Sequence, residues 1–319
     1  MKRAALPIVL CLWWAAAQGQ AYPAKVVKVV APYSASAGPT IFMRLVAERL
    51  SKAWGKQVIV DSRPGASGFL AIEAVKNALP DGHELLVVSN AHVAINPALY
   101  KKLPYDPERD FAPVGMIYHT PFFVTVKSDG PYSGVTALIA AAKAKPGKLT
   151  YGAPYVGSPA HLGAADFARR TGTSMILVPF KDQSQMYLSI ASGDLDWALS
   201  TLASATPLAK AGRIKLVAIA SAKRSGSAPE VPTMREAGGP DFEVDSWLAL
   251  LAPRATPAAV VRKINADMNA ELAAPEVLER MKAMGFTAAP GTPEQLDQAI
   301  RADSKTYAEL VRLTGVSAD

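Results

Sequence analysis

Short β-branched runs alternate with longer amphipathic runs over most of this 319-residue chain. Strand-like runs at 26–30, 58–61 and 85–89 are separated by segments with apolar residues at helical spacing. The first of these places Phe42, Val46, Leu50 and Ala53 on one face, and the second spans 66–78. Strand, helix and strand in repeated order are typical of a parallel sheet with helices on both faces. The sequence therefore predicts an α/β fold.

The alternation stops and then resumes. Residues 96–110 are rich in turn formers, and the extended segment at 114–126 is broken at Pro121. A second alternating unit follows, and it contains predicted helices at 135–143, 158–170 and 183–191 and predicted strands at 149–151, 175–178, 196–199 and 215–221. A second α/β lobe is expected here.

A connector rich in Pro, Gly and Ser at 225–240 leads to a further strand at 244–251. Two long helices are predicted to close the chain, and the second begins at Pro293 and ends near Leu313. The break near Pro121 and the late strand together predict two chain crossings between two lobes. We expect residues 22–121 and 246–319 to form lobe 1, and residues 122–245 to form lobe 2.

The first residues have the pattern of a secretory signal peptide. Lys2 and Arg3 precede an apolar stretch at 4–17, and small residues follow up to Ala21. This pattern predicts cleavage near Ala21, with residues 1–21 removed and the mature protein in the periplasm. An uncleaved membrane anchor is the alternative, but the stretch is short for a bilayer span.

Composition excludes several kinds of site. The only cysteine, Cys11, lies in the signal segment, so thiol catalysis, disulfides and cysteine metal sites are excluded from the mature chain. No metal-binding motif and no glycine-rich phosphate loop occurs, so we expect no metal, no cofactor and no nucleotide. The formal net charge of +7 is scattered, and nucleic acid is not an expected partner.

Two loops carry the functional signal. Ser34, Ser36 and Thr40 lie among small residues between the first strand and its helix. In the second lobe, Ser158 and Pro159 form a strong helix start after a similar loop. Exposed N–H groups at a helix N-terminus bind carboxylate or phosphate, and ligands in α/β sheets bind beyond the carboxyl ends of the strands. The alternative is that the loops only turn the chain.

At these residues the sequence resembles a known family. The stretches YPAKVVKVVAPY, NPALYKKLPYDPERDFAPV and GKLTYGAPYVGSPAHL are similar to the periplasmic solute-binding proteins of tripartite tricarboxylate transporters, the Bug family. The resemblance implies a two-lobe periplasmic-binding-protein-like fold of type 2 with two hinge crossovers. It also implies a monomer that closes on a small organic acid, delivers it to a two-component membrane permease and catalyses no reaction.

The loops and the resemblance together predict a set of ligand-binding residues: Tyr33, Ser34, Ala35, Ser36, Thr40, Ser89, Asn90, His92, Tyr155, Val156, Gly157, Ser158, His161, Phe180 and Thr201. The chain departs from the family pattern in the first loop. Ser36, Ala37 and Thr40 stand where the family has a Gly pair and an Asp, and Asp182 replaces a later Gly. We therefore hypothesise that the site prefers a different acid from typical members, an aromatic or dicarboxylic one.

Other interpretations stay open. Ser158 and His161 could form a nucleophile and base pair, but an N-cap serine already uses its oxygen on the backbone, and no G-x-S-x-G motif occurs. Trp247, Phe122 and Phe180 are interpreted as core or as ligand cover. The alternative functions are a periplasmic sensor that passes its closed state to a receptor and an enzyme that processes a carboxylate.

Overall fold

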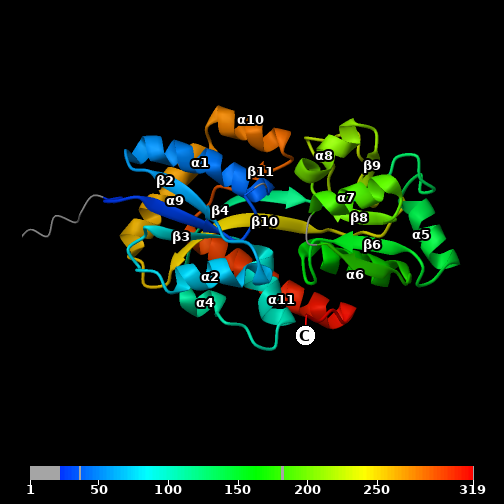
Figure 1. The fold of residues 1–319 in the computed structure, drawn as a ribbon, viewed down its shortest axis with the longest axis horizontal. Coiled ribbons are helices and arrows are strands. Elements are labelled where there is room, and N and C mark those ends of the chain that lie inside the picture. Colours follow the sequence, from blue (N-terminus) through cyan, green and yellow to red (C-terminus); the bar gives the residue numbers. More distant parts are fainter. Residues whose placement is uncertain (1–21, 36, 181–182, 319) are drawn as a thin grey trace, which may run out of the picture.

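The structure is a computed structural model that describes residues 22–35, 37–180 and 183–318 (Figure 1). The predicted signal segment lies outside these residues, as do Ser36 and Asp182. The described chain forms two α/β lobes side by side, as predicted. Within the described ranges, no helix is both long and apolar enough to cross a membrane.

Lobe 1 is built on a six-stranded sheet with the order β11-β4-β10-β3-β1-β2. Strands β1, β2 and β3 are parallel, and β10 is antiparallel to both β3 and β4. The strands are β1 (Val27–Ala31), β2 (Val58–Ser62), β3 (Glu84–Ser89), β4 (Phe111–Pro121), β10 (Asp245–Pro253) and β11 (Thr287–Ala288).

Helices cover both faces of this sheet (Figure 1). Alternate strand residues pack against α1, α9 and α10 on one face and against α2 and α11 on the other, which is why the strands are almost continuously apolar. The helices and helical turns of lobe 1 are α1 (Gly38–Trp54), η1 (Ala66–Gly68), α2 (Phe69–Lys76), η2 (Ala91–Ile95), α3 (Asn96–Leu99), α4 (Pro107–Asp110), α9 (Ala258–Leu272), α10 (Pro275–Ala283) and α11 (Pro293–Thr314).

Lobe 2 has a five-stranded sheet with the order β7-β6-β8-β5-β9. Its strands are β5 (Phe123–Lys127), β6 (Thr150–Ala153), β7 (Ile176–Pro179), β8 (Trp197–Ser200) and β9 (Ile214–Ile219). Helices α5 (Val135–Ala144) and α6 (Pro159–Thr171) pack on one face. Helices α7 (Gln183–Ser192) and α8 (Leu202–Lys210) pack on the other.

The chain passes between the lobes at two adjacent places. The first crossing runs from β4 through Phe122 into β5, and the second leads through Val244 into β10. The two crossings touch, because the Phe122 N–H donates to the Val244 carbonyl at 3.2 Å. The predicted pair of hinge crossovers is therefore confirmed. In each sheet, both crossovers lie at the same end of the strands.

Some sequence predictions were wrong in detail. Helix α8 was missed, because Pro207 lies inside it and its Ala and Ser residues give little periodicity. Helix α10 and strand β11 were also missed, so three helices rather than two follow β10. The predicted helix at 66–78 is the turn η1 followed by the shorter α2, and Ala53 on α1 is exposed.

A buried asparagine connects three parts of lobe 1. Asn265 on α9 donates through Nδ2 to the carbonyls of Val114 in β4 and Gly291 before α11, each at 2.8 Å. A Cβ on Gly115 would lie 2.6 Å from that same Nδ2, so β4 approaches α9 closely here. The Asn265 amide thus donates to the buried Val114 carbonyl and shares the Gly291 carbonyl with Asn269 Nδ2, which donates to it at 2.9 Å.

We expect Asn265→Ala to lower the free energy of unfolding by about 1–3 kcal/mol, because the buried Val114 carbonyl loses the Asn265 donor and the Gly291 carbonyl loses one of its two donors. Urea unfolding followed by circular dichroism measures this. The control is Lys263→Ala on the same helix, which breaks only an exposed ion pair with Asp267. That change should shift the free energy by less than about 0.5 kcal/mol. Equal effects of the two substitutions would contradict the assigned role of Asn265.

Candidate functional site

The two sheets meet at their carboxyl edges. Because β10 is antiparallel to both β3 and β4, strand β4 runs parallel to β3 and ends at the same edge as β1 and β3. That edge leads directly into the crossing at Phe122. In lobe 2, Phe123 at the start of β5 pairs with Ser200 at the end of β8, so the carboxyl ends of β6, β7 and β8 also lie at the crossing.

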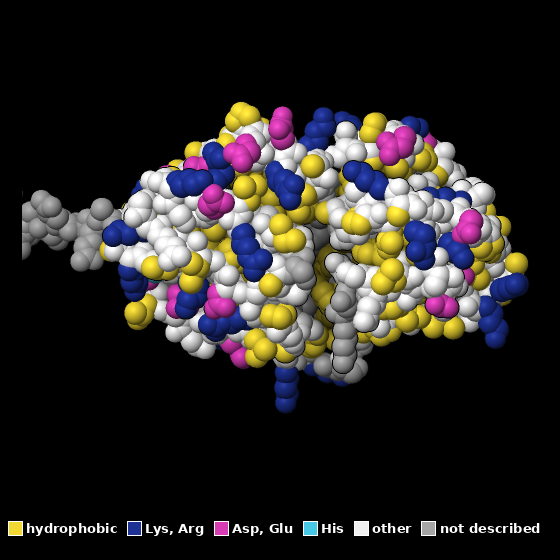
Figure 2. All heavy atoms as spheres, turned by 45° about the horizontal axis from the view of Figure 1, so that its top comes forward, with side chains coloured by type: hydrophobic (Ala, Val, Ile, Leu, Met, Phe, Trp, Pro, Cys, Tyr) yellow, Lys and Arg dark blue, Asp and Glu magenta, His cyan; other side chains and the backbone are white. Residues whose placement is uncertain are grey.

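Loops that follow these strand ends therefore lie at the boundary between the lobes. Figure 2 shows a narrow groove along this boundary on one face of the molecule. Ligands of parallel α/β sheets bind at this edge, where loops and helix N-termini meet. The groove is the place at which the predicted ligand-binding residues of the two lobes can meet.

The first loop leads from β1 into α1. The Tyr33 ring meets the His92 ring edge-on at 5.6 Å between centroids. Thr40, in the first turn of α1, is fully buried, whereas Ser34 and Ala35 are exposed. The exposed Arg44 donates to the Ala35 carbonyl at 2.8 Å, so its guanidinium shapes the loop. The predicted ligand residue Ser36 lies outside the described residues.

The second loop of lobe 1 follows β3. His92 is 4% exposed, and its Nδ1 accepts the Ser89 N–H at 3.1 Å. The Asn90 amide points to the hinge: Nδ2 donates to the Asp245 carbonyl and to Tyr307, and Oδ1 accepts from Ser246. His92 therefore holds the loop, and the Asn90 side chain holds the loop to β10 and α11.

The main loop of lobe 2 leads from β6 into α6. The Ser158 hydroxyl caps α6 by accepting the His161 N–H at 3.1 Å, as predicted for an N-cap. The His161 ring accepts the Gly157 N–H through Nδ1 at 2.9 Å. Tyr155 packs against an apolar cluster that joins residues of both lobes, and Val156 is half-buried. The cluster is made of Ala91, Ala94, Ile95, Leu162 and Tyr307.

Two further predicted residues lie at the ends of neighbouring strands. Phe180 follows β7, where it is half-buried against the core of α7 and donates its N–H to the Ala153 carbonyl at 2.9 Å. Thr201 is the N-cap of α8, and its hydroxyl bonds to Ser204 at 2.9 Å. Trp247 and Phe122 are core residues, which confirms the core interpretation for both.

The predicted ligand residues carry no charge near neutral pH. Burial lowers the pKa of both His92 and His161 to about 4, so each imidazole is neutral and can accept a backbone N–H. The other described residues of the set are uncharged. An anion here would be stabilised by hydrogen-bond donors and by the N-termini of α1 and α6.

Two leucines each pack against a glycine of the opposite lobe, so closely that a side chain on the glycine would not fit. A Cβ on Gly157 of lobe 2 would lie 2.0 Å from Leu99 of lobe 1, and a Cβ on Gly285 of lobe 1 would lie 2.6 Å from Leu202 of lobe 2. Leu99 is 4% exposed. Sequence reasoning missed these contacts, because a contact between lobes leaves no periodic signal in either segment.

The hinge itself carries a polar network that sequence reasoning also missed. His119 in β4 and Asp245 in β10 pair at 2.6 Å, and this bond raises the pKa of the histidine. Trp247 donates to Asp303 of α11 at 2.7 Å. The first bond joins β4 to β10, and the second joins β10 to α11. Lobe 1 is therefore one packed unit up to the crossings.

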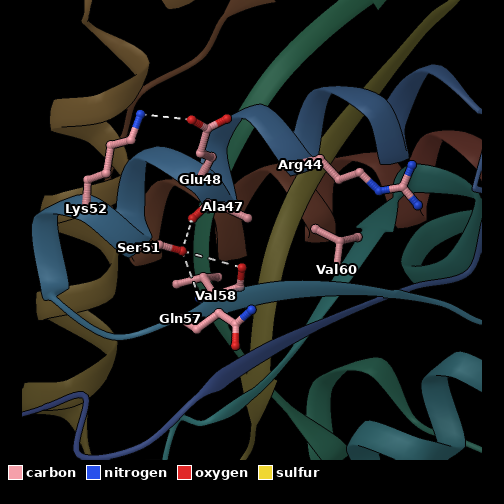
Figure 3. A pocket seen from close by; sticks show the side chains of 8 residues that line it. All are labelled: Arg44, Ala47, Glu48, Ser51, Lys52, Gln57, Val58 and Val60. Atoms are coloured by element: carbon pink, nitrogen blue, oxygen red, sulfur yellow. Dashed lines mark hydrogen bonds and ion pairs between the residues drawn. The ribbon is translucent and has the colours of Figure 1, made fainter.

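A surface hollow of about 400 Å³ lies elsewhere, between the outer face of α1 and strand β2 (Figure 3). Its Ser51 hydroxyl accepts the Val58 N–H at 2.8 Å, and Lys52 pairs with Glu48. None of the predicted ligand residues lines it. Arg44 also lines it and donates to the Ala35 carbonyl of the first loop.

Comparisons with known proteins give a consistent result. The sequence profile described as tripartite tricarboxylate transporter family receptor matches residues 42–316. Protein BugT of Bordetella pertussis is 30% identical over 92% of this chain and 90% of its own. The structure is similar to that of R. palustris Rpa4515 with adipate, with a TM-score of 0.88 and 30% identity, over 93% of this chain and 99% of the other. It is also similar to MatC from Rhodopseudomonas palustris with bound malate, with a TM-score of 0.83 and 27% identity, over 91% and 100% of the two chains.

The lowered pKa values of His92 and His161 predict that the folded protein loses stability in acid. Their pKa of about 4 lies below the ordinary value of 6.5. As the pH falls, the two histidines are therefore protonated in the unfolded chain before they are protonated in the folded protein. Their stabilisation is complete above pH 6.5 and is lost towards pH 4, by about 3 kcal/mol per histidine. The double variant H92Q/H161Q should lose less stability between neutral and acidic pH in urea unfolding.

His119 provides the control, because its pKa is raised rather than lowered. Its stabilisation is present at low pH and is lost as the pH rises through its folded pKa. His119→Gln should therefore not reduce the acid loss. If the double variant loses as much stability between neutral and acidic pH as the unmodified protein, the role of the two loop histidines is contradicted.

Proposed function

Because this chain belongs to the tripartite tricarboxylate transporter receptor family, we propose that it captures a small organic acid between its two lobes in the periplasm and delivers it to a two-component membrane permease. The family is one of periplasmic solute-binding proteins. The observation that carries the proposal is the pair of strand, loop and helix N-terminus units, one on each lobe, at the two carboxyl edges that meet at the crossings.

The chemistry of these loops favours an acid as the ligand. Each lobe has hydroxyl groups and the backbone N–H groups of a helix start at its carboxyl edge, and the described part of the predicted set carries neither a carboxylate nor a cation. Such donors stabilise an anion without a counter-ion. Rpa4515 and MatC, which are similar to this chain over nearly its whole length, hold adipate and malate.

The mechanism that we propose is hinge closure. Only the two adjacent crossings connect the lobes covalently, with residues 22–121 and 246–319 in lobe 1 and residues 122–245 in lobe 2. A ligand that touches both lobes only in the closed form shifts the population towards that form. In this mechanism, the contacts of Leu99 with Gly157 and of Leu202 with Gly285 form when the lobes close.

Transport supports this function better than catalysis does. The Ser158 oxygen already accepts a backbone N–H, and the His161 ring accepts another, so neither is available as a nucleophile and base pair. We further propose that residues 1–21 are a cleaved signal peptide, that the mature protein is a monomer, and that the permease recognises its closed form.

A panel of organic acids tests the ligand class. We expect at least one acid among linear, branched and aromatic mono- and dicarboxylates to raise the melting temperature of the mature chain. At 100 times its dissociation constant, the acid should add about 2.7 kcal/mol of stability. Primary amines and neutral sugars are the controls. Stabilisation by a control alone, or by no acid, would contradict the proposal.

The closure step is tested by a matched pair of glycine substitutions at the two ends of α6. Gly157 and Gly172 both have positive φ, so alanine strains the backbone at either. Only at Gly157 would the new methyl group meet the opposite lobe. Gly157→Ala should therefore weaken binding of the best acid by about tenfold or more, a loss of about 1.4 kcal/mol.

Gly172→Ala has nothing within 4 Å of the new methyl group and should leave affinity unchanged. Adding Leu99→Ala to Gly157→Ala should restore much of the affinity, because it removes the atoms that clash. Isothermal titration calorimetry gives the affinities, and small-angle X-ray scattering gives the fraction closed. Equal weakening by both single glycine substitutions would argue against closure at this contact.

A further inference from the structure

The outer end of lobe 2, away from the groove, is formed by the amino ends of its parallel strands. Because the carboxyl ends of β6, β7 and β8 lie at the crossing, these strands begin at the outer end. Strand β9 begins there too, since β8 and β9 are both antiparallel to β5, and Ile214 of β9 pairs with Lys127. Figure 1 shows α5 at the same end of the molecule. The last turn of α5 and the segments before β6 and β9 therefore share one surface.

Six cations lie on this surface, in the last turns of α5 and α8 and beside the first residues of β6 and β9. They are Lys143, Lys145, Lys148, Lys210, Arg213 and Lys215, and together they are called the basic end. Lys215 is half-buried and the other five are exposed. Among residues 22–35, 37–180 and 183–318, none of the six forms an ion pair, so their charge faces solvent.

The arginines elsewhere in lobe 2 are different, because each is paired with a carboxylate. Arg169 and Arg170 both pair with Asp166, Arg224 pairs with Glu236, and Arg235 pairs with Asp241. Unpaired positive charge in this lobe is thus concentrated at the outer end rather than spread evenly.

The carboxylates beside the basic end are bonded to other groups. Asp129 pairs with Lys127 at 3.7 Å. Asp196 accepts the Tyr132 hydroxyl at 2.6 Å and the Thr150 N–H at 2.7 Å. The third, Asp194, accepts a hydrogen bond from Ser192 at 2.6 Å. These bonds hold the carboxylates in the strand ends, so they do not form ion pairs with the basic end.

The basic end is broad and has no apolar centre. Adjacent strands lie about 4.8 Å apart, so β6 and β9, three places apart in the sheet, begin about 14 Å from each other. The large exposed apolar side chains of lobe 2, Ile176 and Leu188, belong to β7 and α7, not to the segments that carry these cations. Specific protein interfaces have an apolar centre with charges at the rim. A broad positive surface without one suits the diffuse negative charge of a lipid surface better.

We propose that the basic end binds the anionic phospholipid headgroups of a membrane and holds the protein beside the bilayer. The inference goes beyond the proposed function, and it needs no bound acid. Because the basic end lies at the opposite end of the strands from the groove, the groove stays accessible while the basic end contacts the membrane. A permease lies in a bilayer, so this contact raises the local concentration of the binding protein next to it.

Sedimentation of the mature protein with vesicles tests the inference. The vesicles consist of phosphatidylcholine alone or of equal parts of phosphatidylcholine and phosphatidylglycerol, and no acid ligand is added. We expect binding only to the vesicles that contain phosphatidylglycerol. This binding should be lost between about 0.1 M and about 1 M salt, where the Debye length falls from about 10 Å to about 3 Å.

The triple variant K145Q/K148Q/R213Q removes half of the basic end. A cation near an anionic lipid surface strengthens binding about fivefold, so this variant should bind the phosphatidylglycerol vesicles about a hundredfold more weakly. Its melting temperature should not change, because the three side chains are exposed and unpaired within the described chain.

The matched control is K56Q/R280Q/K282Q, which removes two lysines and one arginine from lobe 1. These three residues are also exposed, and they form no ion pair with any described residue. The two triple variants have the same net charge and differ only in where the charge is lost. The control should bind the vesicles as the unmodified protein does.

Poly-L-glutamate offers negative charge as a peptide instead of a lipid. Binding to poly-L-glutamate without binding to phosphatidylglycerol vesicles would assign the basic end to an acidic protein surface and overturn the inference. Absence of binding to both would overturn it too. Equal weakening by the two triple variants would show that net charge alone matters, and it would also overturn the inference. None of these results bears on the proposed function, because the acid panel measures that function without vesicles.

Discussion

The rest of this structure depends on which end of the parallel strands of each sheet lies at the crossings. The hydrogen bond from Phe122 to Val244 holds the two crossing strands side by side at the carboxyl edges of both sheets. Helix N-termini follow those edges in each lobe, so their unpaired N–H groups gather at one boundary. Had either sheet met the crossings at its amino edge, the helix C-termini of that lobe, with their partial negative charge, would lie there instead.

Neutral histidines make this boundary suitable for an anion without placing a charge in it. His92 and His161 each lie just beyond a loop and accept a backbone N–H of that loop, at Ser89 and Gly157. Burial keeps both rings neutral, so the acceptor nitrogen is available at physiological pH. The loops are thereby held in place, and a ligand does not have to order them. Recognition can then depend on hydroxyls and N–H groups, whose positions a few substitutions can change.

The sequence allowed the fold class, the two crossings and the helix start at Ser158 to be predicted, because each has a local signal. Strand and helix periods are visible in single segments, and a Ser-Pro pair defines a helix start. Helix α8 has Pro207 inside it and no such signal. The contact between Leu99 and Gly157 joins residues of opposite lobes, and so does the apolar cluster that contains Ala91 of lobe 1 and Leu162 of lobe 2. Contacts of this kind come from tertiary structure alone. The hydrogen bonds of the Asn90 amide at the hinge are of the same kind, because Asp245 and Ser246 lie far from Asn90 in the sequence.

Closure and specificity have a common physical basis in this cleft. Leu99 of lobe 1 packs against Gly157 of lobe 2, and Leu202 of lobe 2 packs against Gly285 of lobe 1. A ligand that contacts both lobes only when these contacts form would stabilise that form over the open one, because a ligand shifts an equilibrium only by its differential affinity for the two states. The two contacts therefore limit how closely the helix N-termini of the two lobes can approach a shared ligand. A ligand whose acceptors fit that spacing would shift the equilibrium further than one that fits a single lobe.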